Sequence, residues 1–137
     1  MRDVLIGFLL ADAGIAALVQ NRVHWLRQPD QVSGYPYVNL QGISDPDLYH
    51  MKGAARLRQS LVQADCWALT YGAAWRLNEA LSARLSGFRG QFDGPPAVSV
   101  SGVFITGRRD DVDTSEKLER PLFRVSLDFQ INWLKGA

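Results

Sequence analysis

The fold class of this chain follows from the stretch FRVSLDFQINW at residues 123–133. Large apolar side chains occupy every odd position from Phe123 to Trp133, and polar side chains occupy the even positions between them. Strict alternation is typical of a β-strand with one buried face, because successive side chains point to opposite faces of a sheet. The stretch therefore predicts a long strand that covers an apolar core on one side only.

A second long strand is predicted at Leu57–Leu69, where small residues alternate with larger or polar ones. One face of it carries Val62, Ala64, Cys66 and Ala68, and the other carries Gln63, Asp65 and Trp67. Shorter strands are predicted at Val23–Leu26, Tyr35–Ile43 and Ala97–Ile105. Pro36 has no N–H to donate, so it fits only at the start of a strand or on an edge strand.

Helices are predicted at the N-terminus and directly after the Leu57–Leu69 strand. Asp3 and Asp12 are suited to cap two short N-terminal helices, the second of which runs through Val19. Thr70 is suited to cap a longer helix that ends at Gly87 or Gly90. The apolar stripe of this helix consists of Ala74, Leu77, Leu81, Leu85 and Phe88.

This order of elements predicts an α+β fold, in which a mixed, mostly antiparallel sheet has its helices packed on one face. A length of 137 residues is ordinary for one domain with one core, so residues 1–137 are expected to form a single domain. The formal net charge of +1 gives no electrostatic preference for nucleic acid. Cys66 is the only cysteine, which excludes an intrachain disulfide and fits a reducing compartment.

The apolar run Val4–Val19 is similar to a signal peptide, but Asp3 offsets the charge of Arg2, and Asp12 interrupts the run. We therefore expect neither a cleaved signal nor a membrane span.

No catalytic or metal-binding pattern is found. His24 and His50 are the only histidines, and neither has a second ligand at the spacing of a metal site. Gly102–Gly107 is similar to a phosphate-binding loop but lacks its lysine and its serine or threonine. The acidic run Asp110–Asp113 lacks the glycine and glutamate that a calcium loop requires. The sequence thus predicts a protein that is not an enzyme and has no cofactor or metal.

The hydrophilic segment 106–120 is either a long exposed loop or the tip of a hairpin between two strands. Together with the polar connection Ser44–Arg56, it supplies the candidate assembly surface, because exposed loops are frequent sites of protein contact. The candidate interface residues are Asp47, His50, Lys52, Arg56, Arg108, Arg109, Asp110, Asp111, Glu116 and Lys117.

Four stretches in the same order resemble the tail-completion proteins of long-tailed bacteriophages, which also occur in prophages and gene transfer particles. The stretches are LLADAGIAALV at 9–19 with Arg22-Val23, YPYV at 35–38, VQADCWA at 62–68 and FRVSLDF at 123–129. The resemblance covers nearly the whole chain. It implies a tail terminator, a small α+β subunit that forms a ring, a hexamer, on the finished tail tube.

Such a ring halts tube polymerisation and joins the tail to the head. The resemblance thus implies three partners: other copies of the chain, the major tail tube protein and the head-tail connector protein. It implies a location in the virion at the head-tail junction after assembly in the host cytoplasm, with no membrane and no small-molecule substrate.

Two other classes of function stay open on the sequence alone. A small enzymatic or ligand-binding domain would need a deep polar pocket around His24, His50 or Asp65. A nucleic-acid-binding adaptor would use arginines such as Arg84, Arg89 and Arg120, and would retain DNA with a steep dependence on salt.

Overall fold

The computed structural model describes residues 1–26, 34–46, 49–51, 53–54, 56–94, 96–114 and 121–134. Its helices are α1 (Arg2–Leu10), α2 (Ala13–Val19) and α3 (Tyr71–Leu85). Its strands are β1 (Val23–Trp25), β2 (Tyr37–Ser44), β3 (Tyr49–His50), β4 (Gly53–Ala54), β5 (Leu57–Ala68), β6 (Gly90–Phe92), β7 (Val98–Asp113) and β8 (Leu122–Leu134).

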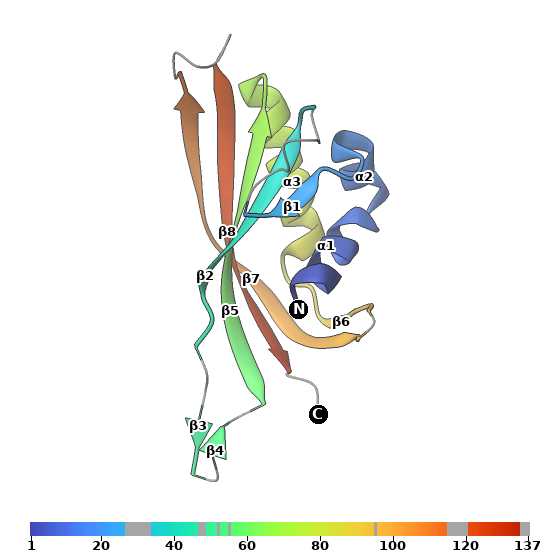
Figure 1. The fold of residues 1–137 in the computed structure, drawn as a ribbon, viewed down its shortest axis with the longest axis vertical. Coiled ribbons are helices and arrows are strands. Elements are labelled where there is room, and N and C mark those ends of the chain that lie inside the picture. The colour runs from blue at the N-terminus through green and yellow to red at the C-terminus, as the bar shows by residue number, and fades with distance from the viewer. Residues whose placement is uncertain are drawn as a thin grey trace.

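Six strands form one twisted sheet in the order β1-β2-β5-β8-β7-β6 (Figure 1). All neighbouring pairs are antiparallel except β1 and β2, which are parallel. The three helices of the described residues lie on the same side of this sheet (Figure 1). The predicted α+β class, with a mixed, mostly antiparallel sheet and helices on one face, is confirmed.

The core lies between the sheet and the helices. The apolar side chains of the two alternating strands, β5 and β8, point into it. The side chains of Val62, Ala64 and Cys66 from β5 are buried together with Leu127 and Phe129 from β8. The stripe of α3 and one face of α1 complete this core with Leu77, Leu81, Leu85, Leu5 and Leu9. We call the opposite side of the sheet, which none of the three helices covers, the open face.

Two of the three predicted helix caps are present. Asp12 accepts hydrogen bonds from the backbone N–H groups of Gly14 and Ile15, and Thr70 accepts one from Ala73. The predicted cap at Asp3 is wrong, because α1 begins at Arg2, two residues earlier than a cap at Asp3 implies, with Met1 as its N-cap. Asp3 instead lies in the first turn, where its charge interacts favourably with the helix dipole.

The end of α3 also differs from the prediction. The helix ends at Leu85, so Phe88 lies outside it, and Gly87 adopts a positive φ of 73° just beyond. The ring of Phe88 still packs against the core, where its centroid is 4.4 Å from that of Phe8.

The hydrophilic segment after Ile105 is largely a strand. β7 continues to Asp113 and pairs with β8 along its length, so the reading of 106–120 as one long loop is wrong. Asp, Glu and Lys are depleted in strands, which is why the composition left a loop open as one of the two alternatives. The alternative of a hairpin between two strands agrees with the antiparallel pairing of β7 with β8. Its tip is shorter than the predicted 106–120, and residues 115–120 lie outside the described residues.

Candidate assembly surfaces

The charged residues of β7 are divided between the two faces of the sheet. Because side chains alternate along a strand, Arg108 and Asp110 point to the side of α3, while Arg109 and Asp111 point to the open face. The structure thus separates four candidate residues that are consecutive in the sequence.

Arg108 is bound to α3. Its Nε donates a hydrogen bond to Asn78 Oδ1 at 3.2 Å, and its Nη2 donates one to Ser82 Oγ at 2.7 Å. Asn78 is fully buried and donates from Nδ2 to the backbone oxygen of Val125 at 3.3 Å. This chain of bonds fixes the outer half of β7 against the helix.

Asp110 marks a small aromatic patch, defined here as Tyr71, Trp75 and Phe123. Tyr71 donates a hydrogen bond to the Asp110 carboxylate at 2.9 Å, which raises the pKa of the tyrosine hydroxyl. The ring of Tyr71 is stacked with that of Trp75 and meets Phe123 edge-on, each at a centroid distance of 6.4 Å. Exposed Tyr and Trp are typical of protein interfaces, so this patch is suited to contact another protein.

The open face carries a hydrogen-bonded polar network. Arg109 Nη2 donates to Gln63 Oε1 at 2.7 Å and to Asp128 Oδ1 at 3.2 Å. Asp65 Oδ1 accepts from Gln63 Nε2 at 2.7 Å and from Ser126 Oγ at 2.6 Å. These bonds connect β5, β8 and β7 across the sheet and hold the side chains in fixed positions.

A second row of the open face combines aromatic rings with an ion pair. Arg124 forms a salt bridge to Asp111 at 2.8 Å, and its guanidinium lies 5.4 Å from the ring centre of Trp67. Trp67 stacks with Tyr37. Burial raises the pKa of Tyr37 to about 12. The row extends across four strands, from β2 to β7.

Below the polar network, the open face is hollowed. A shallow depression of about 480 Å³ is lined by Ile43, Leu61, Gln63, Thr106, Arg109 and Asp128. Ile43 belongs to β2 and Thr106 to β7, so the depression reaches across the sheet between those two strands.

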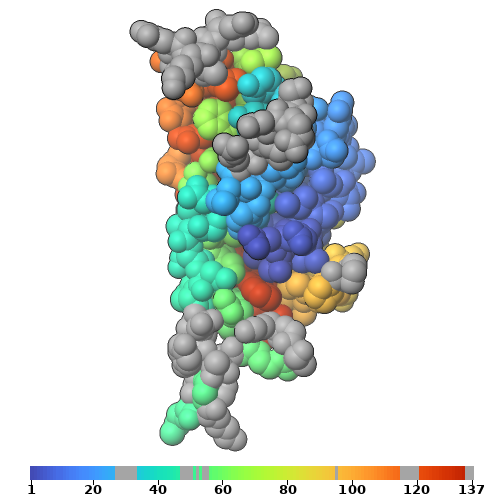
Figure 2. Space-filling view, in the orientation of Figure 1, coloured from blue at the N-terminus to red at the C-terminus, as the bar shows by residue number. Residues whose placement is uncertain are grey.

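The connection between β2 and β5 forms an arm, defined here as residues 45–56. Its strands β3 and β4 pair with each other and project from the lower end of the molecule (Figures 1 and 2). Met51 lies at the turn between them with a fully exposed side chain. Such a projecting element with an apolar tip is suited to reach a neighbouring subunit.

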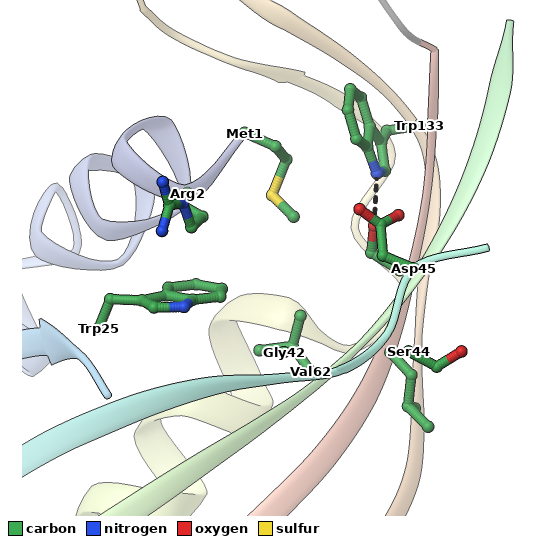
Figure 3. Close-up of a pocket in the computed structure, with 10 residues that line it drawn as sticks. Met1, Arg2, Trp25, Gly42, Ser44, Asp45, Val62 and Trp133 are labelled. Carbon is green, nitrogen blue, oxygen red and sulfur yellow. Dashed lines mark hydrogen bonds between the residues drawn. The ribbon is translucent and has the colours of Figure 1, made fainter. Parts of the chain in front are cut away.

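A cavity of about 240 Å³ lies at the base of the arm, between Trp25, Trp133 and Met1 (Figure 3). Trp133 Nε1 donates to Ser60 Oγ at 2.9 Å, and Ser60 Oγ donates to Asp45 Oδ1 at 2.9 Å. Asp45 also pairs with Arg58 at 3.0 Å, which ties the base of the arm to β5. The cavity is smaller than the roughly 300–1,000 Å³ typical of small-molecule sites.

The structure places the predicted interface residues in two separate regions. Arg108, Arg109, Asp110 and Asp111 lie on the upper half of β7, whereas Arg56 and the backbone of His50 belong to the arm at the opposite end. The remaining four candidates lie outside the described residues: Asp47, Lys52, Glu116 and Lys117.

Sequence reasoning missed the exposed apolar residues. Tyr71 and Trp75 lie off the predicted apolar stripe of the helix, and Ile43 and Phe104 lie within predicted strands, so no sequence pattern singled them out. The run Val103-Phe104-Ile105 did contain a signal, because three consecutive apolar residues in a strand must place one of them on the other face. That residue is Phe104, which is 54% exposed.

The residues considered for other chemistry lie in ordinary surroundings. Gly102–Gly107 is the middle of β7, so its backbone is extended and forms no loop around a phosphate. Asp65 is occupied by the open-face network, and Cys66 is buried in β5. Within the described ranges, no group of three His, Cys, Asp or Glu side chains is placed to hold a metal ion. None of the described helices is both long and apolar enough to span a membrane.

Comparison with solved structures identifies a chain of similar fold. It belongs to the virion of a native gene transfer agent particle and aligns with a TM-score of 0.69 at 22% sequence identity. The alignment covers 98% of this chain and 94% of that chain. The two chains share one fold. No protein-family model matches the sequence, and no curated protein does so either.

Proposed function

We propose that this chain is a structural virion subunit that acts as a tail terminator. It forms a ring, a hexamer, on the finished tail tube, stops the polymerisation of the tube and joins the tail to the head connector. The observation that carries this proposal is the likeness to a gene transfer agent virion chain over nearly the full length of both chains.

The surfaces of the subunit support a ring. A closed ring needs a head-to-tail interface, in which two different patches of one subunit meet across each boundary. This chain has an arm at one end of the sheet, and an aromatic patch beside charged side chains at the other. Candidate contacts are therefore the arm, with His50 and Arg56, and the upper part of β7, with Arg109 and Asp111.

The proposed partners are other copies of this chain, the major tail tube protein and the head-tail connector protein. No cofactor or substrate enters the proposal, because shape and charge complementarity are sufficient for assembly. The proposed location is the head-tail junction of the virion, reached after assembly in the host cytoplasm.

Deletion of the gene in a host that produces the particle tests the role in tails. We expect tails of uncontrolled length that carry no heads, and restoration of normal particles by the gene in trans. The purified protein is expected to form a ring visible by electron microscopy, with a mass by light scattering that rises with concentration. Absence of the chain from purified particles, together with a monomer at high concentration, would contradict the proposal. Salt-sensitive retention of DNA would favour the adaptor function instead.

A further inference from the structure

Two stretches of strand edge have no partner strand among the described residues. β6 pairs only with Val98–Val100 of β7, so the outer side of β7 from Ser101 to Val112 has no partner strand among the described residues, although the Gly87 N–H binds the Val103 carbonyl there. β1 pairs only with Val38–Leu40 of β2, which leaves the outer side of β2 open from Gln41 to Ser44. β2 and β7 are thus edges where another chain can add a strand.

The directions of these two strands are compatible. β2 is antiparallel to β5, β5 to β8, and β8 to β7, so β2 and β7 run in opposite directions. Copies in a ring are related by rotation and point the same way along its axis. The β7 edge of one copy therefore meets the β2 edge of the next as an antiparallel pair.

The backbone groups that point outward restrict the register of this pair. On β2, the Val38 N–H and the Leu40 carbonyl are bonded to residues on the outer side, Arg22 and Leu26. On β7, the Val103 carbonyl accepts from Gly87 on the outer side. Because these directions alternate along a strand, the next outward groups are those of Gly42 and Ile105.

Pairing Gly42 with Ile105 of the next copy places Ile43 directly opposite Phe104. Both side chains belong to the open face, and they are unusually exposed for apolar residues, at 47% and 54%. Within one subunit, a row on the open face runs from Phe104 through Gln130 and Leu61 to Ser44, and Ile43 lies in the β-bulge beside Ser44. Ile43 and Phe104 occupy equivalent positions along the two edges, so in the ring each would bury the exposed apolar surface of the other.

We propose that the ring closes by a short antiparallel pairing of Phe104 and Ile105 of β7 with Gly42 and Ile43 of the next copy's β2, with Phe104 packed on that copy's Ile43. This inference rests on the ring proposed above and adds a strand-edge contact to the candidate contacts at the arm and the upper part of β7. The contact is head-to-tail, since the two residues lie on different edges. Within the subunit, the Phe104 ring lies close over Gly102, where an added Cβ would be only 3.0 Å from the ring, so this glycine leaves room for the Phe104 side chain.

Engineered cysteines test the contact. In the proposed register, Ile43 and Phe104 form a non-hydrogen-bonded pair, whose Cα atoms are about 4.5 Å apart, within the range that a disulfide bridges. We expect the double variant Ile43→Cys/Phe104→Cys to lose its monomer band on a non-reducing gel after mild oxidation, with a ladder that ends at the number of subunits in the ring. The native Cys66 is buried and does not compete.

Three controls separate the outcomes. The pair Asn39→Cys/Phe104→Cys is displaced by four residues, roughly 13 Å along the strand, and should not cross-link. Each single variant should stay uncross-linked, and a disulfide dimer of Ile43→Cys alone would overturn the head-to-tail contact. Circular dichroism and melting temperature should match the unmodified chain.

The oxidation is carried out on purified rings, and on purified particles where rings form only on the tube. Rings that show no ladder, or that cross-link equally through position 39, would overturn this contact and leave the tail-terminator proposal intact. Absence of the chain from any ring or particle would overturn both.

Discussion

Arg84 of α3 holds the carbonyl oxygen of Phe8 at the end of α1. Its Nε and Nη2 donate to that oxygen at 3.1 and 3.0 Å, and its guanidinium lies 3.8 Å from the centre of the Phe8 ring. Carbonyls in the last turn of a helix have no partner within it, so this arginine satisfies one of them and joins two helices.

Substitution of Arg84 should therefore destabilise the fold. We expect Arg84→Ala to lower the free energy of unfolding by about 2–3 kcal/mol, since a hydrogen bond from a charged donor and a cation–π contact are both lost. Arg84→Lys should show an intermediate loss, because an ammonium does not reproduce the planar fork. Arg76→Ala, at an exposed position of the same helix, is the matched control in urea unfolding and should change the value by less than about 0.5 kcal/mol.

The bond between Arg108 and Asn78 gives a second prediction. Asn78→Ala removes the side-chain hydrogen bonds to the Val125 carbonyl and to Arg108 and should cost about 1–3 kcal/mol of unfolding free energy. In a double-mutant cycle, Asn78→Ala and Arg108→Ala should be coupled by about 0.5–3 kcal/mol, because the two side chains share a bond. Arg109→Ala, on the other face of β7, should add independently to Asn78→Ala. Additivity of Asn78→Ala and Arg108→Ala would show that the hydrogen bond between these two side chains contributes nothing to stability.

Phe129 and Trp133 belong to the same apolar row of β8, but their burial differs. Phe129 is fully buried, and Phe129→Ala should lower the free energy of unfolding by about 3–5 kcal/mol. Trp133 borders the open cavity at the base of the arm, so Trp133→Ala should cost only about 1–3 kcal/mol. Thermal and urea unfolding measure both. Unchanged stability of both variants would mean that this row is not a core but an assembly surface.

The long regular elements were predictable because one period persists along each of them. β5 and β8 keep their alternation, and α3 keeps its apolar stripe, over most of their length. The same pattern therefore predicted both the type of each element and the side chains that it buries in the core. The parallel pairing of β1 with β2 and the β3–β4 pair were not predictable, because two or three residues carry no readable period.

The assembly surface was harder to predict than the core, because the alternation of side chains between the two faces of the sheet is interrupted twice along β7. Its register with β8 shifts between Val100 and Gly102 and again between Ile105 and Gly107. Each irregularity moves the following side chains to the other face, so Phe104 lies on the open face although it stands in an apolar run. The two glycines that looked like a phosphate loop in fact accompany these shifts, as glycines in strands commonly do.

The Cys66 thiol provides a probe of the fold at alkaline pH. Complete burial raises the pKa of this thiol far above its ordinary value of 9.0, so the folded chain keeps it protonated where the unfolded chain would ionise it. The unfolded state then binds fewer protons, and stability falls as the pH rises above about 9. Below about pH 9, the thiol is protonated in both the folded and the unfolded state, so it does not make the free energy of unfolding depend on pH.

We therefore expect the free energy of unfolding to fall between pH 9 and 11, with Cys66 contributing a slope of up to about 1.4 kcal/mol per pH unit. Cys66→Ala should remove that part of the slope, whatever its effect on packing at pH 7. Tyr37, whose pKa is raised to about 12, should add a decline above pH 10 that Tyr37→Phe removes. In the folded chain at pH 8, the thiol should resist alkylation by iodoacetamide and react fully in urea. Rapid alkylation of the native protein, or an unchanged slope in Cys66→Ala, would show that this part of β5 opens to water and does not hold the core closed.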